Sequence, residues 1–266
     1  MNALHGKVAV VTGGTGGIGK GVALRLAARG ATVVINGRNE HKAEAVLTEI
    51  RSAGGTGHFV AGDVCSRVDM DAVAAEAAHR FGGIDIVVPS AGGVDGETRS
   101  TAVRGPFSDI DLVRVTALIG QSVAAKLLVV QAAVPYLRER GGGSVTFITS
   151  EGGRVPTPGQ TAVATLSGGL LMASKVLSKE LVRHQIRVNC VCVTVVRDSP
   201  SWENAFGREG GVSHHHRKQY EKIIERSPLG VAAPSDVGNV VAFLASDDAH
   251  HLTGATISPT GGLTIH

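Results

Sequence analysis

The sequence predicts an α/β protein in which a doubly wound parallel sheet lies between two layers of helices. Three observations support this. Short apolar runs rich in β-branched residues alternate along the chain with longer segments of helical periodicity. The short runs are apolar almost throughout, as strands covered on both faces are. The 266 residues contain no linker and no internal repeat, so we expect one domain over residues 1–266.

Each expected element follows from a local pattern, and strands and helices alternate in order. Runs dominated by Val, Ile and other β-branched residues predict strands over residues 8–11, 32–36, 57–61, 84–89, 144–149, 188–195 and 256–258. Segments in which apolar residues recur every three to four positions predict helices over residues 19–29, 41–53, 68–80, 110–138, 163–184 and 235–245.

The composition argues against several classes of function. Glycine contributes 36 of the 266 residues and aromatic residues only 3%, so the core must be aliphatic. The formal net charge of +3 is small and the basic residues are scattered, unlike those of a nucleic-acid-binding protein. No uninterrupted apolar run reaches the roughly 18 residues of a membrane-spanning helix, and no signal-peptide pattern is present. We therefore expect a cytoplasmic protein that binds neither nucleic acid nor membrane.

The cysteines and a run of three histidines are the candidate metal ligands of the chain. Cys65, Cys190 and Cys192 are an odd set, which fits reduced thiols. Cys190 and Cys192 share one face of an expected strand and are interpreted as buried thiols, because a metal or redox pair would need further ligands. The three histidines at 214–216 are consecutive and do not converge on one ion from regular backbone. No metal site is expected.

Two polar, glycine-rich stretches interrupt the alternation, at residues 92–106 and 197–217. Each follows an expected strand, and ligand-binding loops of parallel sheets collect at the carboxyl ends of strands. We interpret residues 197–217, which carry Trp202 and the histidines, as a mobile lid over a site for a small-molecule substrate.

A glycine cluster, the run TGGTGGIG, follows the first expected strand and opens the first helix. Glycines there permit a tight turn and close approach of a pyrophosphate, while the free N–H groups at the helix start bind the anion. This pattern is typical of a Rossmann-type dinucleotide site. The candidate cofactor residues on this loop are Thr12, Gly13, Thr15, Gly17, Ile18 and Gly19.

The end of the second strand indicates which nicotinamide cofactor is used. NAD-selective folds usually offer a carboxylate there to the ribose 2′-OH, whereas this chain has Gly37 and Arg38. A guanidinium suits a 2′-phosphate, so NADP(H) is favoured. Asp63 is placed to bind the adenine amino group, with a helix cap as the alternative. Three further candidates, from the segments after the third and fourth strands, are Val64, Ala91 and Gly92.

The glycine loop, the Asp63-Val64 step, Ser150, the run IRVN and the tail LTGA…GG resemble the short-chain dehydrogenase/reductase family over nearly the whole chain. The similarity is closest to ketoreductases of the 3-oxoacyl-carrier-protein reductase type. It implies a Ser that orients the substrate carbonyl and a Tyr that transfers the proton. It also implies a Lys that lowers the pKa of that Tyr and an Asn that supports a water relay. A homotetramer or homodimer assembled through the two long helices is implied as well.

Only the first of these four catalytic positions is retained. Ser150 matches the Ser, whereas the family spacing places Val163 at the Tyr position and Ser167 at the Lys position. The flanking runs PGQ and IRVN support this count without a gap. Counting back from Gln131 places Ser122 at the Asn position. The turn after the fourth strand and the segment after the sixth strand also depart from the family pattern.

The missing Tyr leaves the chemistry open. Val163 cannot transfer a proton and Ser167 cannot supply a cation, so reduction of an unactivated ketone should be poor. Substitute donors are Lys126, Tyr220 and the histidines of the lid. Three functions remain: an NADP(H)-dependent reductase of an activated carbonyl, enone or imine; a non-redox cyclase, dehydratase or isomerase; and a catalytically inactive subunit.

Overall fold

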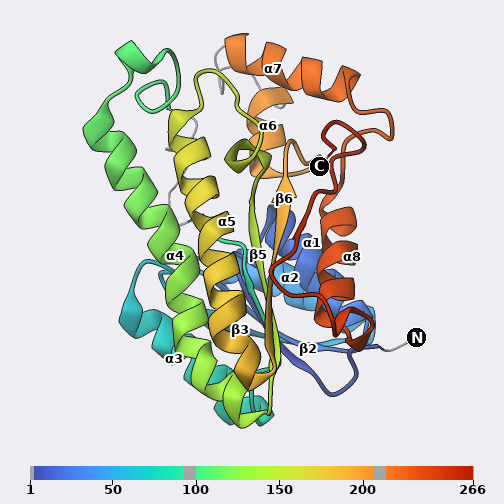
Figure 1. Cartoon of the computed structure of the whole chain (residues 1–266). Coiled ribbons are helices and arrows are strands. Elements are labelled where there is room, and N and C mark those ends of the chain that lie inside the picture. The colour runs from blue at the N-terminus through green and yellow to red at the C-terminus, as the bar shows by residue number, and fades with distance from the viewer. Residues whose placement is uncertain (1–2, 93–99, 207–213, 266) are drawn as a thin grey trace.

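The fold is a seven-stranded parallel sheet in the order β3-β2-β1-β4-β5-β6-β7 (Figure 1). A computed structural model describes residues 3–92, 100–206 and 214–265 of the chain. The order reverses between β1 and β4, which makes their carboxyl ends the expected ligand crevice. The strands are β1 (Val8–Thr12), β2 (Thr32–Gly37), β3 (Thr56–Ala61), β4 (Ile86–Pro89), β5 (Gly143–Ser150), β6 (Ile186–Val193) and β7 (Thr256–Ile257).

Helices cover both faces of the sheet, and the three-layer α/β/α prediction is confirmed. One layer is α1 (Gly17–Ala28), α2 (Glu40–Ser52) and α8 (Pro234–Ala245). The other is α3 (Arg67–Phe81), α4 (Leu112–Glu139) and α5 (Thr161–Leu181). The short helices α6 (Pro200–Phe206) and α7 (His214–Glu225) lie across the carboxyl end of the sheet (Figure 1).

Strand side chains alternate between two aliphatic cores. In β1, Ala9 and Val11 pack against the α1 side, while Val10 packs against the α3–α4 side. In β6, Cys190 and Cys192 both face the α3–α5 core, fully buried, as the alternation predicted. Burial raises the pKa of the Cys190 thiol to about 11 and that of Cys192 to about 12, so both are neutral thiols.

The prediction that residues 197–217 are irregular needs correction, because the described part contains all of α6 and the start of α7. The sequence analysis missed both helices because α6 spans only seven residues and α7 is mostly polar, so neither gives a sustained apolar period. That this segment acts as a lid stays a prediction. The side chains of the histidines at 214–216, and residues 207–213, lie outside what the structure describes. No cluster able to hold a metal occurs among the described side chains.

Two helices are more apolar than the absence of a long uninterrupted apolar run in the sequence suggests. Helix α4 and the helical run Thr161–His184 are each long and apolar enough to cross a membrane by length and composition. Both lie side by side against the sheet in Figure 1. Their buried sides belong to the core, so their apolar character has an explanation in the fold itself.

Candidate functional site

The glycine-rich loop has the geometry expected of a phosphate cradle. Gly13 and Gly17 have φ values of +67° and +50°, in the left-handed region that glycine tolerates. A Cβ on Gly19 would collide with the Gly13 carbonyl oxygen, and one on Gly14 would lie 2.7 Å from Ile35 Cγ2. Gly16, the N-cap of α1, makes no side-chain cap and has nothing within 4 Å of a Cβ position. The first N–H groups of α1 therefore face open space that suits an anion.

Neighbouring residues support this loop. Thr12 is fully buried, and its Oγ1 accepts hydrogen bonds from the backbone N–H groups of Ser90 and Ala91 at 3.2 and 3.3 Å. Thr12 therefore acts on the cofactor crevice by joining β1 to the turn after β4. A Cβ on Gly13 would lie 3.1 Å from the Ala91 backbone, so that turn and the glycine loop are in close contact. Gly92, at the end of the turn, has open space beside it.

Two further members of the candidate set pack around the loop. Thr15 lies against the end of β2, where a Cβ on Gly37 would come within 2.8 Å of Thr15 Cγ2. A side chain at position 37 would therefore displace Thr15. Ile18 packs against the α1-side core. Its role is to anchor the first turn of α1.

Arg38, Asp63 and Cys65 lie together at the carboxyl edge of β2 and β3. The pKa of Cys65 is raised, first by burial and then by the Asp63 charge, and the Arg38 charge opposes this. Asp63 accepts a hydrogen bond from the Cys65 N–H at 2.9 Å. The helix-cap alternative for Asp63 is wrong, because Ser66 caps α3 by accepting from the Asp69 N–H. Val64 is buried beside this group.

Lys126 is a fully buried ammonium at the turn after β4. Its Nζ donates to the carbonyl oxygens of Pro89 at 3.1 Å and Ala91 at 3.2 Å, with Ser90 at 3.5 Å. Burial lowers its pKa to about 8. Lys126 therefore holds the turn from one side while Thr12 holds it from the other. Lys126 is not among the residues that line the cavity beside Ser150, so its place as a substitute proton donor stays a prediction.

The four residues that the sequence analysis predicts at the catalytic positions lie in two places. Ser150 and Val163 line one cavity of about 470 Å³, and a Cβ on Gly152 would lie 3.3 Å from Val163 Cγ1 and 3.4 Å from Ser150 Oγ. Ser150 Oγ also accepts from the Gly152 N–H at 3.1 Å. Ser122 and Ser167 are buried and are not among the residues that line this cavity, and neither hydroxyl has a hydrogen-bond partner within the described part of the chain. Both are packed in the interior of the protein.

Tyr220 reaches the same cavity from α7. The wall opposite Ser150 is formed by this helix and the end of the chain, through Tyr220, Ile223 and Leu263. The phenol ring of Tyr220 lies 6.2 Å from the Phe206 ring, which in turn contacts Trp202. Of the substitute donors considered from the sequence, Tyr220 is thus brought to the Ser150 cavity.

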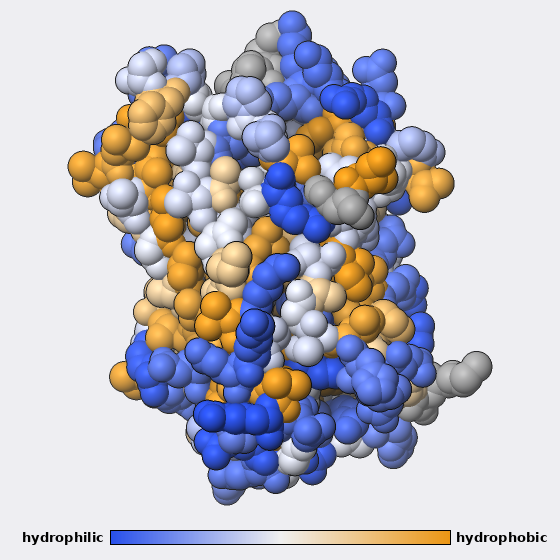
Figure 2. All heavy atoms as spheres, in the orientation of Figure 1, coloured by the Kyte–Doolittle hydropathy of each residue, from blue (hydrophilic) through white to orange (hydrophobic). Residues whose placement is uncertain are grey.

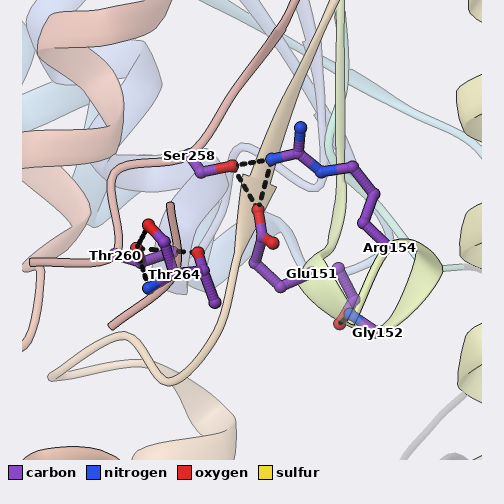
Figure 3. A network of polar contacts seen from close by, with 7 residues as sticks. Glu151, Gly152, Arg154, Ser258, Thr260 and Thr264 are labelled. Atoms are coloured by element: carbon purple, nitrogen blue, oxygen red, sulfur yellow. Dashed lines mark hydrogen bonds and ion pairs between the residues drawn. The ribbon is translucent and has the colours of Figure 1, made fainter. Parts of the chain in front are cut away.

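A buried ion pair beneath the cavity was not anticipated. Glu151 is 2% exposed, and its carboxylate accepts from Arg154 Nη2 at 2.9 Å and from Ser258 Oγ (Figure 3). Arg154 also donates to Ser258, so all three groups converge. Ser258 comes from the segment after β7, which this contact ties to the end of β5. No sequence signal pairs residues so far apart.

Known proteins of one family resemble this chain over nearly its whole length. A family model described as "Enoyl-(Acyl carrier protein) reductase" matches residues 13–264. The 2,5-dichloro-2,5-cyclohexadiene-1,4-diol dehydrogenase LinX of Sphingobium indicum is 32% identical over 264 residues, covering 99% of this chain and 98% of that protein. The 3-oxoacyl-[acyl-carrier-protein] reductase FabG of Thermotoga maritima is 31% identical, covering 98% and 99%. A 7α-hydroxysteroid dehydrogenase solved with NADH and 7-oxo glycochenodeoxycholic acid has a TM-score of 0.85, with 25% identity and coverage of 98% and 96%.

Proposed function

Because this chain belongs to the short-chain dehydrogenase/reductase family, we propose that it is an NADP(H)-dependent oxidoreductase that reduces an activated carbonyl, enone or imine. The observation that carries the proposal is that Ser150, Val163 and Tyr220 line one cavity, while the glycine loop remains open for a dinucleotide. The family relationship supports a nicotinamide cofactor. The choice of NADP(H) rests on the Arg38 charge at the carboxyl edge of β2.

The residues present fit the cofactor. Gly16 and Gly92 leave open space for the dinucleotide, the first turn of α1 offers N–H groups, and Arg38 offers a cation near Asp63. When bound, the nicotinamide would supply a hydride. The chain supplies the rest: the Ser150 hydroxyl donates a hydrogen bond to the substrate oxygen or nitrogen, and the Tyr220 hydroxyl delivers the balancing proton.

An activated acceptor matches this incomplete set of catalytic groups. General acid catalysis typically contributes a factor of about 10²–10⁴, and Val163 supplies none of it. Hydride addition to a simple ketone places negative charge on one oxygen. An enone spreads that charge over an enolate, and a protonated imine becomes a neutral amine, so a less well placed acid suffices. The apolar side chain of Val163 then forms part of the cavity wall beside Ser150.

Substitution of Tyr220 by Phe tests the assignment. Calorimetric titration should show NADPH binding unchanged in Tyr220→Phe, because Tyr220 belongs to the substrate cavity and not to the glycine loop. Turnover of activated enones and imines should fall by about 10²-fold or more. Unchanged turnover would refute Tyr220 as the donor. Absence of NADPH and NADH binding to the unmodified protein would favour a non-redox catalyst or an inactive subunit.

We also propose that the protein acts in the cytoplasm as a homodimer or homotetramer assembled through α4 and α5. Large apolar side chains stay exposed on these helices, with Val113 79% and Met172 61% accessible. Figure 2 shows apolar residues gathered along this side of the molecule. Light scattering should report a dimer or tetramer for the full chain and a smaller species for Met172→Glu with Val176→Glu. A monomeric unmodified chain would refute the assembly.

A further inference from the structure

We propose that the cavity beside Ser150 is built for an organic anion, a compact apolar skeleton that carries one carboxylate or a similar negative group. The inference names the substrate class of the proposed reductase and so rests on that function for its chemistry. Its basis is the distribution of charged and apolar side chains around the cavity.

Basic side chains dominate the ionisable groups of the cavity wall. Arg104, Lys222 and Arg226 line the cavity, and among the residues that the structure describes Glu151 is the acidic one in its wall. The Glu151 carboxylate is already offset, because Arg154 and Ser258 both bind it beneath the cavity (Figure 3). The wall therefore presents an excess of positive charge to a ligand.

Helix α7 and the residue after it contribute two basic side chains to the cavity. Gln219, Lys222, Ile223 and Arg226 recur at three- and four-residue intervals and all line the cavity, as one face of a helix does. Both acidic residues of the helix, Glu221 and Glu225, lie outside the lining, and Glu221 pairs with Arg217. The face of α7 that borders the cavity therefore carries basic and no acidic side chains among the described residues, although Lys222 and Arg226 also remain accessible to solvent.

A second wall adds positive charge from a distant part of the chain. Arg104 belongs to the segment between β4 and α4 and is half-buried. Its guanidinium is positively charged at every accessible pH. Cations from two separate elements thus line one cavity, which favours a bound anion over a solvated basic surface.

Apolar side chains form a large part of the remaining lining and set the body of the ligand. They are Val155, Pro156, Pro158, Val163, Val195, Ile223 and Leu263, and uncharged polar side chains complete the wall. A volume of about 470 Å³ lies within the range of roughly 300–1,000 Å³ typical of single small molecules. A ring or short chain would contact this surface, with its reactive group at Ser150 and its negative group toward the basic side chains.

The test uses two probes with the same skeleton, 8-anilinonaphthalene-1-sulfonate and neutral N-phenyl-1-naphthylamine. Fluorescence titration of the full chain without nicotinamide should show the anion binding about tenfold more tightly at low salt, which corresponds to about 1.4 kcal/mol. High salt should reduce this preference, because it screens the exposed charges of α7. Since no turnover is measured, failure of the proposed reaction would not affect the result.

Charge-reversal variants test whether Lys222 and Arg226 cause the preference for the anionic probe. Lys222→Glu with Arg226→Glu should abolish the preference for the anion and leave the neutral probe unchanged. Lys218→Glu is the matched control, since Lys218 is exposed on the same helix and does not line the cavity. Equal affinities for both probes in the unmodified protein, or a preference that survives the double reversal, would overturn the proposal. Arg104→Gln, on the other wall, provides the same test should the double variant fail to fold.

Discussion

Replacing Lys126 with Met should remove a specific pH dependence from the stability of this protein. The Lys126 ammonium is buried, and it donates hydrogen bonds to carbonyl oxygens of the turn after β4. The titratable side chain near it is the Cys190 thiol. No carboxylate is bonded to it among the described residues. Burial therefore penalises the charged form, and the pKa falls from 10.5 to about 8.

Proton linkage gives the sign and the size of this pH dependence of stability. Between pH 8 and 10.5 the unfolded chain keeps the Lys126 proton while the folded protein releases it, so stability rises with pH in that window. A tenfold change in an equilibrium corresponds to about 1.4 kcal/mol. The folded protein therefore carries a penalty of about 3 kcal/mol at pH 7. Roughly 2 kcal/mol of it should be relieved by pH 9.5.

Urea unfolding at several pH values measures this effect. The free energy of unfolding of the unmodified protein should increase by about 2 kcal/mol relative to Lys126→Met between pH 7 and 9.5. Lys179→Met, at an exposed position of α5, is the control and should run parallel to the unmodified protein. Parallel curves for the unmodified protein and Lys126→Met would show that the buried ammonium is not destabilised, and would refute the reasoning.

Three further predictions concern the cofactor and the chemistry. Arg38→Asp should weaken NADPH binding at least tenfold more than NADH binding in calorimetry, because a carboxylate repels the 2′-phosphate; equal effects would refute the phosphate assignment. Gly16→Ala should leave the melting temperature nearly unchanged and weaken NADPH binding about tenfold, since the added methyl enters open space at the start of α1. Val163→Tyr with Ser167→Lys should raise turnover of a simple ketone by about 10²-fold in a coupled NADPH assay if proton transfer alone is missing.

The Gly16→Ala prediction has a direct control. Gly120→Ala in α4 also adds a methyl in open space, but within a helix, so it should raise stability by up to about 1 kcal/mol and leave NADPH binding unchanged. An unchanged NADPH affinity in Gly16→Ala would contradict the cradle. No gain for the Val163 and Ser167 double variant would show that the cavity itself, and not only its acid, has diverged.

Much of the fold could be predicted because its signals are local. Strands buried on both faces are apolar almost throughout, and in β1 all five residues are buried and four of them are Val or Ala. The glycine loop was predictable because two of its residues need positive φ, and Gly14 and Gly19 have no space for a Cβ. Element ends were less well predicted: α1 begins at Gly17 and α5 at Thr161, each two residues earlier than expected.

The sequence by itself determined the parallel sheet and the glycine-rich loop, because period and steric demand are written along the chain, and it predicts from spacing the substituted positions at Val163 and Ser167. Only the tertiary structure decided which distant side chains meet. It brought Tyr220 to the Ser150 cavity, joined Glu151 to Ser258, and placed Lys126 under the turn after β4. These contacts depend on helix packing and on loops that return across the sheet, and no pattern within one segment specifies them.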